Sequence, residues 1–320
     1  MWQLLQNNSS VEIPQTRHTH ARVDNFMEVI CSYSDVQYRS HFRLRRETVS
    51  ILVAEYDADE TKRSMTNLSG ELAVHLTLWY LANTEPFRAV SDRFGLDIVN
   101  SYYGIMDGTR WLCIKSPEFI QWPTDAEKET IAATFGNKGP FYDVIGLIDC
   151  CHIKIRCPIE SKIDFYNRKK FYSIHLQAIV DDQFRFRDVH VGEPGSMHDS
   201  TVLQKSDFYK SVCQDNETMA KFHLLGDSAY VSTKWLISPF KNDGTLTRNH
   251  QRFNYQISKL RVRVEHAFGQ MKSMWRRLHF FNNLRQDFIV HCVVACCVLH
   301  NIHIEFDRDI LNENYEGRSE

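Results

Sequence analysis

Residues 144–157 read VIGLIDCCHIKIRC, and this stretch decides the fold class. An apolar run from Val144 to Ile148 leads directly to Asp149. A continuous apolar run, rather than an alternating one, is typical of a central strand covered on both faces of a sheet. Such a strand predicts a mixed α/β domain in which a carboxylate lies at the end of a buried element.

The stretches downstream supply the rest of such a domain. Residues 169–192 predict two strands joined at Asp181-Asp182, and residues 195–212 become helical after Asp199. FHLLGDSAY, residues 222–230, predicts a buried strand that ends in a Gly-Asp-Ser turn. Residues 253–278 predict a long amphipathic helix, with its apolar stripe at Leu260, Val264, Ala267, Met271, Trp275 and Leu278.

The first part of the chain has a helical pattern instead. Residues 69–81 open with a Ser cap, and residues 86–94 predict a short helix that ends at Gly95, followed by a second helix from about Asp97. This pair suits either a helix-turn-helix that reads DNA or a plain helical hairpin. The second helix would offer to solvent Asn100, Ser101, Tyr102, Tyr103 and Arg110. The expected organisation is a flexible N-terminus (1–20), a helical domain (21–125), an α/β domain (140–305) and an acidic tail (306–320).

Composition describes an ordinary soluble globular chain of 320 residues, 43 % hydrophobic and 24 % charged. Its nine cysteines form no Cys-x-x-Cys pair, which favours a reducing, intracellular compartment. The apolar run 288–304 is short for a membrane span and predicts a buried helix. Its cysteines and histidines suit either the core or a zinc site, and core packing is favoured for His291, Cys292, Cys296, Cys297, His300 and His303.

Charge is unevenly distributed along a chain whose net charge is −2. Residues 241–285 hold ten Lys and Arg against Asp243 and Glu265 alone, a local charge of +8. A basic block in a nearly neutral chain indicates either one polyanion-binding surface or a solvated helix face.

Three carboxylates stand out by their position: Asp149 after the first buried strand, Asp227 after the later one, and Glu265 on the amphipathic helix. Converging carboxylates repel one another unless cations neutralise them, and oxygen ligands suit Mg²⁺ or Mn²⁺. Asp227 would be either a metal ligand or only a turn-former. Arg261 and Lys272 share one helix face with Glu265. The two cations would either bind a DNA backbone beside the glutamate or form only surface ion pairs with it.

Four blocks in order, LIDCCHIKI, HLQAIVDDQFRFRDVHVGEPGSMHDSTVL, LLGDSAYVSTKWLISPF and RVRVEHAFGQMKSMWRRL, resemble the DDE endonuclease domain of PIF/Harbinger transposases. The likeness is strongest to the domesticated Harbinger transposase-derived nucleases and covers roughly residues 140–300. It implies an RNase H-like fold with a mixed central sheet, preceded by a small all-helical, helix-turn-helix-like domain.

The resemblance also implies roles for individual residues. Asp149 matches the first catalytic aspartate, Asp227 the second, and Glu265 the glutamate, together holding two Mg²⁺ or Mn²⁺ ions. Asp199, in GSMHDS, competes with Asp227 as a metal ligand, although a helix N-terminal acid would satisfy backbone amides in the same place. The residues expected to bind the DNA backbone are Arg261, Lys272, Arg276 and Arg277.

Two functions follow from the resemblance. The first is a metal-dependent DNA endonuclease of the two-metal DDE type, expected in the nucleus, with the cytoplasm as a second expected location. The second is an inactive transposase derivative that binds DNA or protein together with a Myb/SANT-like partner. Cys150 and Cys151 stand where the family has small or hydroxyl residues, which favours the second function. A zinc site of Cys150, Cys151 and His152 is disfavoured because neighbouring strand residues point to opposite faces.

Overall fold

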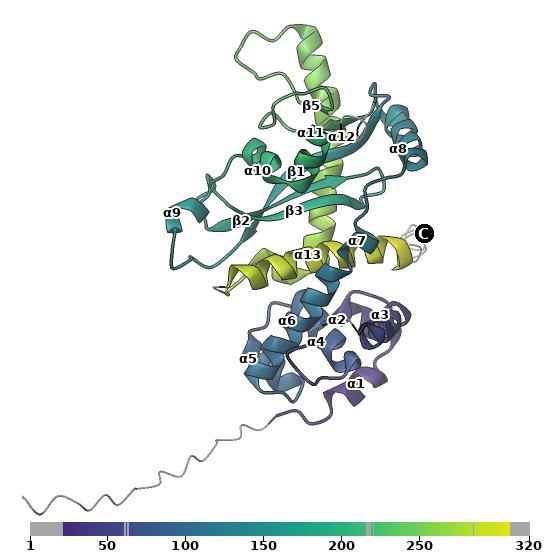
Figure 1. Ribbon diagram of the computed structural model, residues 1–320, viewed down its shortest axis with the longest axis vertical. Helices are drawn as coiled ribbons and strands as arrows, with labels where there is room; N and C mark the ends of the chain where they lie inside the picture. Colours follow the sequence, from purple (N-terminus) through teal and green to yellow (C-terminus); the bar gives the residue numbers. More distant parts are fainter. Residues whose placement is uncertain are drawn as a thin grey trace, which may run out of the picture.

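The computed structural model describes residues 22–307 except 61, 63, 216–218, 220 and 284. The expectations for residues 1–20 and for most of the tail, 308–320, lie outside the described residues. A helical region and a sheet region are stacked end to end, with α13 (Gln286–Ile302) lying across the boundary between them (Figure 1).

The helical region is built from short helices with clear starting signals. Ser34 and Gln37 form a reciprocal capping box at α2, Ser69 caps α4 as expected, and Thr124 forms a capping box at α8. The bounds are α1 Phe26–Ser32, α2 Asp35–Phe42, α3 Arg46–Ala58, α4 Gly70–Ala82, α5 Phe87–Arg93, α6 Ile98–Ile114, α7 Ser116–Phe119 and α8 Asp125–Lys138.

The predicted helix pair is confirmed as α5 and α6, with Gly95 in the left-handed region at φ +68° and Asp97 capping α6. The exposure predicted for α6 is only partly right. Ser101 is fully buried and Tyr102 is half-buried, because α6 packs against both α4 and α13. The middle of this helix therefore belongs to the core, whereas its first turn, Tyr103, Arg110 and Ile114 face solvent.

The sheet has five strands in the order β3-β2-β1-β4-β5, which confirms the mixed central sheet. β1, β2 and β3 are antiparallel neighbours, whereas β4 runs parallel to β1 and β5 parallel to β4. The bounds are β1 Val144–Lys154, β2 Ser173–Val180, β3 Phe186–Pro194, β4 His223–Leu225 and β5 Leu236–Ile237. The turn between β2 and β3 lies at Asp181-Asp182, as predicted, where Asp181 accepts hydrogen bonds from the backbone of Gln183 and Arg185.

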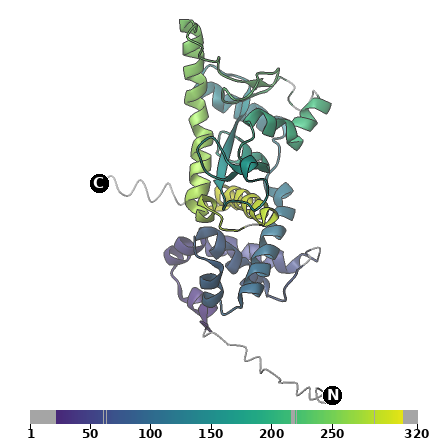
Figure 2. The same ribbon diagram turned by 90° about the vertical axis from the view of Figure 1, so that its left-hand side faces the viewer.

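Helices cover both sides of this sheet. The long helix α12 (Arg248–Met274) runs along one side, while α10 (Asp199–Lys205) and α11 (Asp207–Gln214) lie on the other (Figure 2). Two short helical segments complete this region, α9 (Lys162–Phe165) and η1 (Arg276–His279). Every residue of the predicted apolar stripe of α12 and η1 is at most 3 % exposed, so the amphipathic pattern is confirmed.

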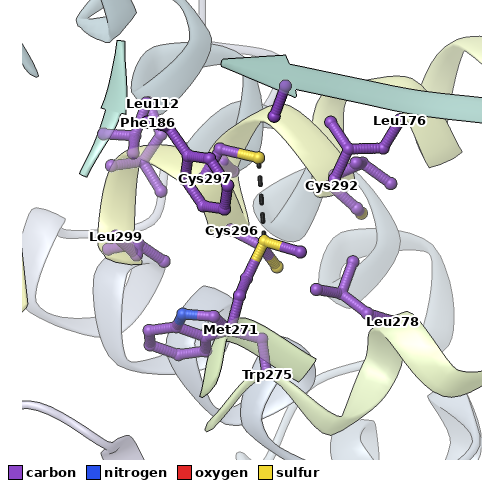
Figure 3. Close-up of a cluster of buried hydrophobic side chains, with 14 of the residues drawn as sticks. Leu112, Leu176, Phe186, Met271, Trp275, Leu278, Cys292, Cys296, Cys297 and Leu299 are labelled. Atoms are coloured by element: carbon purple, nitrogen blue, oxygen red, sulfur yellow. Dashed lines mark hydrogen bonds between the residues drawn. The ribbon is translucent and has the colours of Figure 1, made fainter. Parts of the chain in front are cut away.

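The apolar stretch after residue 285 is the core helix α13. Together with the turn that follows it, this helix forms the span Gln286–Asp307, which is long and apolar enough to cross a membrane, but 72 % of its most apolar window is buried inside the protein. Cys292, Cys296 and Cys297 are all fully buried, and the Cys297 thiol lies 3.7 Å from the Met271 sulfur (Figure 3). The interpretation of these cysteines as core residues is confirmed.

Polar contacts fasten the helical region to the sheet region. Asp307, at the end of the π-helical turn η2 (His303–Asp307), is fully buried and accepts hydrogen bonds from the Arg45 backbone and guanidinium and from Thr48, at 2.7–2.9 Å. Burial raises the pKa of Asp307, but the hydrogen bonds from His303, Thr48 and Arg45 outweigh this and hold it well below its usual range. Asp307 therefore stays ionised and joins the C-terminal turn to α3.

Asp307→Ala should lower the free energy of unfolding by about 3 kcal/mol at pH 7, because it leaves Arg45 and Thr48 without their acceptor. The difference from wild type should shrink as the pH falls below about 4, where this carboxylate loses its stabilising effect. Urea denaturation at several pH values measures both effects. The control is Glu305→Ala, since Glu305 is exposed on the same turn; equal losses in both variants would contradict the assignment.

Candidate metal centre

Parallel pairing brings Asp149 and Asp227 together. Leu147 on β1 pairs with Leu225 on β4, and each aspartate lies two residues beyond its paired leucine. Strands in one sheet lie about 4.8 Å apart, so residues at matching positions are neighbours. One detail differs from the sequence prediction: Asp149 lies within β1, which continues to Lys154 beside β2, rather than after the strand.

Asp227 also shapes the turn that holds it. Its Oδ1 accepts a hydrogen bond from the Ala229 amide at 2.8 Å, an arrangement typical of an aspartate turn. A side chain at Gly226 would approach Tyr230 to 2.9 Å, so glycine is needed for this close packing. The two roles weighed for Asp227 are therefore compatible: one oxygen forms the turn while the carboxylate lies beside Asp149.

Asp199 completes a group of three carboxylates. It is the first residue of α10, which packs against β2 on the sheet side opposite α12. Ligand oxygens of Asp149, Asp199 and Asp227 all lie within 4.8 Å of one another. Helix capping at α10 is done by His198, which accepts from the Ser200 amide. Asp199 thus belongs to the carboxylate group instead of capping its helix.

Burial and crowding make the ionised state of this group costly. Burial raises the pKa of Asp149 to about 6; Asp227 and Asp199 add to the rise, while Arg261 opposes it. Burial also raises the pKa of Asp199, with Asp227 adding to the effect and His175 opposing it. The positive charge of Arg261 offsets this cost at Asp149 only in part. The donor set is therefore chemically suited to a hard divalent cation.

Glu265 does not join this group of aspartates. It is exposed on α12, one turn after Arg261 and on the same helix face as Lys272. Those two cations reach β1: Arg261 donates to Asp149 Oδ2 at 3.0 Å, and Lys272 donates to the His152 carbonyl at 2.9 Å. Along α12, Glu265 accordingly lies between Arg261 and Lys272, the two residues that contact β1.

The remaining predicted phosphate-binding residues differ in their surroundings. Arg276 is exposed. Arg277 is only 6 % exposed, stacks on the Tyr80 ring at 4.0 Å, and donates to the backbone carbonyls of Tyr80 and Glu85. Its guanidinium fastens η1 to the helical region, so Arg277 is not part of the exposed basic surface.

Sequence reasoning missed His175, although it rightly disfavoured a site made of Cys150, Cys151 and His152. Cys150 lies close to His175 and Asp199, not in a site with Cys151 and His152. His175 stands in the strand SIHLQAIV without any motif to mark it. The available signal was the strand register, which could be set only after β1 and β2 had been paired.

Comparisons with known proteins bear on the same segment. Residues 148–301 match the family described as DDE superfamily endonuclease. Residues 148–301 are therefore similar to a DDE endonuclease domain. Over 312 residues it is 26 % identical to the human protein named "Putative nuclease HARBI1", covering 94 % of this chain and 86 % of that protein. It is also 26 % identical to "Protein ALP1-like" of Arabidopsis thaliana over 88 % of this chain and 76 % of that protein.

These matches confirm the resemblance to Harbinger transposase-derived nucleases and, with the sheet order, the RNase H-like fold class. They support a function of nuclease type at the coarse level of the family. No solved structure matches the chain significantly.

In EDTA, the raised pKa of Asp149 should make wild-type stability decline as the pH rises. The pKa of about 6 in the folded state exceeds the value of about 3.9 for an unfolded chain. The contribution of Asp149 to stability is therefore complete below about pH 4 and is lost as the pH passes about 6. Asp149→Asn should reduce this decline by up to roughly 2–3 kcal/mol in urea titrations.

The matched control is Asp243→Asn, which changes an exposed loop aspartate and should keep the wild-type decline. If the stability of Asp149→Asn fell with rising pH as much as that of wild type, the raised pKa of Asp149 would not be the cause of the decline.

Proposed function

We propose that this chain is a divalent-metal-dependent endonuclease that hydrolyses DNA phosphodiester bonds. One observation carries the proposal: Asp149, Asp199 and Asp227 converge within 4.8 Å inside a DDE endonuclease domain. Mg²⁺ or Mn²⁺ would be held by Asp149 and Asp227, with Asp199 and Glu265 as the further carboxylates. Bound at these oxygens, such cations supply Lewis acidity to a phosphodiester.

The protein's own residues do the positioning. Asp149 and Asp227 are fixed by paired strands, so their carboxylates are preorganised and need no movement to meet. Arg261, Lys272 and the exposed Arg276 lie along α12 and η1 and would place the DNA backbone over the carboxylates by charge. Glu265 lies between them on the solvent side, where a substrate phosphate approaches.

Asp149→Asn should lower metal-dependent nicking of supercoiled DNA by about 10³-fold or more, because it removes the proposed metal ligand on β1. The matched control is Asp188→Asn on β3. Burial raises the pKa of Asp188 to about 6 as well, but Asp188 is outside the carboxylate group. Nicking is measured by conversion to open circles, and far-UV circular dichroism checks the fold. Equal nicking by wild type and Asp149→Asn would overturn the proposed function.

Two variants test whether Asp199 or Glu265 is the third carboxylate that binds the metal. Because Asp199 lies within the group and Glu265 lies outside it, we expect Asp199→Asn to weaken Mn²⁺ binding of the free protein more than Glu265→Gln does. If Glu265 joins only with substrate present, Glu265→Gln should reduce nicking while leaving Mn²⁺ affinity intact. Isothermal titration and the nicking assay together separate these roles. A larger loss of affinity in Glu265→Gln would reverse the assignment.

A second function is supported by the ion pair between Arg261 and Asp149. Arg261 donates to Asp149 Oδ2 at 3.0 Å, so the chain itself supplies a positive charge to the carboxylate group. On this basis the domain would bind DNA or a Myb/SANT-like protein without cleaving DNA. Two measurements decide between the functions. Mn²⁺ binding to wild type that is lost in Asp227→Asn supports the nuclease. DNA binding that EDTA does not change, together with the absence of nicking, supports the binding module. We further propose a nuclear location, because DNA is the substrate or ligand in this proposal.

A further inference from the structure

A second set of ligand atoms lies next to the three aspartates. The Cys150 thiol, a ring nitrogen of His175 and a carboxylate oxygen of Asp199 all lie within 4.8 Å of one another. Asp199 is common to both sets, whereas Cys150 and His175 take no part in the proposed nuclease chemistry. Thiol, imidazole and carboxylate groups together form a donor set of a different chemical type from the all-oxygen group.

Strand pairing explains why these residues meet. Cys150 on β1 is directly opposite Gln177 on β2, and His175 lies two residues from Gln177 on the same strand. Residues two apart on a strand share a face, and diagonal neighbours across a pair remain within side-chain reach. Asp199 approaches that face from α10, which packs on β2. Three secondary-structure elements therefore hold the three ligands.

The His175 ring is buried and lacks a hydrogen bond of standard geometry. The residue is 1 % exposed, neither Nδ1 nor Nε2 makes such a bond, and the polar groups that interact with the ring are the backbones of Gly195 and Met197. The closest carboxylate oxygen, Asp199 Oδ1, is 3.8 Å from Nδ1, too far for a hydrogen bond. An unsatisfied buried polar group costs about 1–3 kcal/mol, so a ligand on one ring nitrogen would relieve a real penalty.

The Cys150 thiol has partners that a metal ion could replace. It is hydrogen-bonded to the Tyr230 hydroxyl at 3.4 Å and lies 3.9 Å from Gln177 Oε1. Both are weak interactions of a sulfur that is a poor donor and acceptor. Neither contact fixes the thiol in a way that would prevent metal ligation.

We propose that Cys150, His175 and Asp199 form a second metal site, selective for Zn²⁺ and chemically similar ions. Three protein ligands of the types S, N and O, with a fourth position for water or substrate, match the open tetrahedral arrangement of zinc. Thiolate and imidazole favour such ions over Mg²⁺ and Mn²⁺. Binding forms the sulfur–metal bond and releases the thiol proton to solvent.

Sharing of Asp199 couples the two sites. A zinc ion held by Cys150 and His175 draws on the carboxylate that also lies beside Asp149 and Asp227. This site goes beyond the proposed nuclease function and does not depend on it, because Cys150 and His175 belong to this set alone and the preferred ion differs.

The test is titration of wild-type protein with Co²⁺, a spectroscopic substitute for Zn²⁺, followed by competition for Zn²⁺ against a chromophoric chelator. Wild type should show a thiolate-to-cobalt charge-transfer band and retain Zn²⁺ in excess Mg²⁺. Cys150→Ser should lose the band and bind Zn²⁺ about 100-fold more weakly, since even outer ligand partners are worth 10–100-fold. Cys151→Ser is the matched control, because the neighbouring strand residue faces the other side of the sheet.

Loss of the band in Cys150→Ser but not in Cys151→Ser supports the site. The same Co²⁺ spectrum and Zn²⁺ affinity in wild type and Cys150→Ser would overturn it, as would Co²⁺ binding without any thiolate band. His175→Asn provides a second variant with the same expected loss, and thermal melts confirm that each variant folds. Failure of the nuclease would appear as absent nicking and would leave the cobalt spectrum unchanged, so the two outcomes are distinguishable.

Discussion

The candidate site depends on the parallel pairing of β1 with β4. Only three residues of β4 take part in the strand, yet their register places Leu225 beside Leu147 and hence Asp227 beside Asp149. The energy that brings two like charges together comes from the apolar residues that precede them, which are buried on both faces of the sheet. A shift of one residue would turn one of the aspartates to the opposite face and separate the pair.

Positive charges approach the pair of aspartates from only one side of the sheet. Arg261 and Lys272 approach β1 from α12, whereas α10 brings a further acid, Asp199, from the opposite side of the sheet. The result is a strip of β1 on which consecutive residues face different chemistry. Asp149 takes part in an oxygen-rich group, and Cys150 takes part in a set that contains sulfur and nitrogen.

Much of this could be predicted from the sequence because buried strands and amphipathic helices leave periodic patterns. The uninterrupted apolar run before Asp149, the turn at Asp181-Asp182 and the stripe along α12 all match the structure. Tertiary packing was harder to predict. Ser101 looked like a surface residue because local periodicity cannot reveal that α13 covers α6. His175 and Asp199 meet Cys150 through register and helix docking, which no single stretch of sequence encodes.

The position of α13 has a consequence for how this protein can be divided. Its buried faces contact α6 in the helical region and β3 in the sheet, and Asn301 donates hydrogen bonds to the carbonyls of Phe119 and Phe186. One helix thus belongs to two cores at once. A fragment beginning near residue 140 would retain this helix with one apolar side bare, and such a surface promotes aggregation. The helical region therefore serves the sheet region as a fixed cover and is not a separable module.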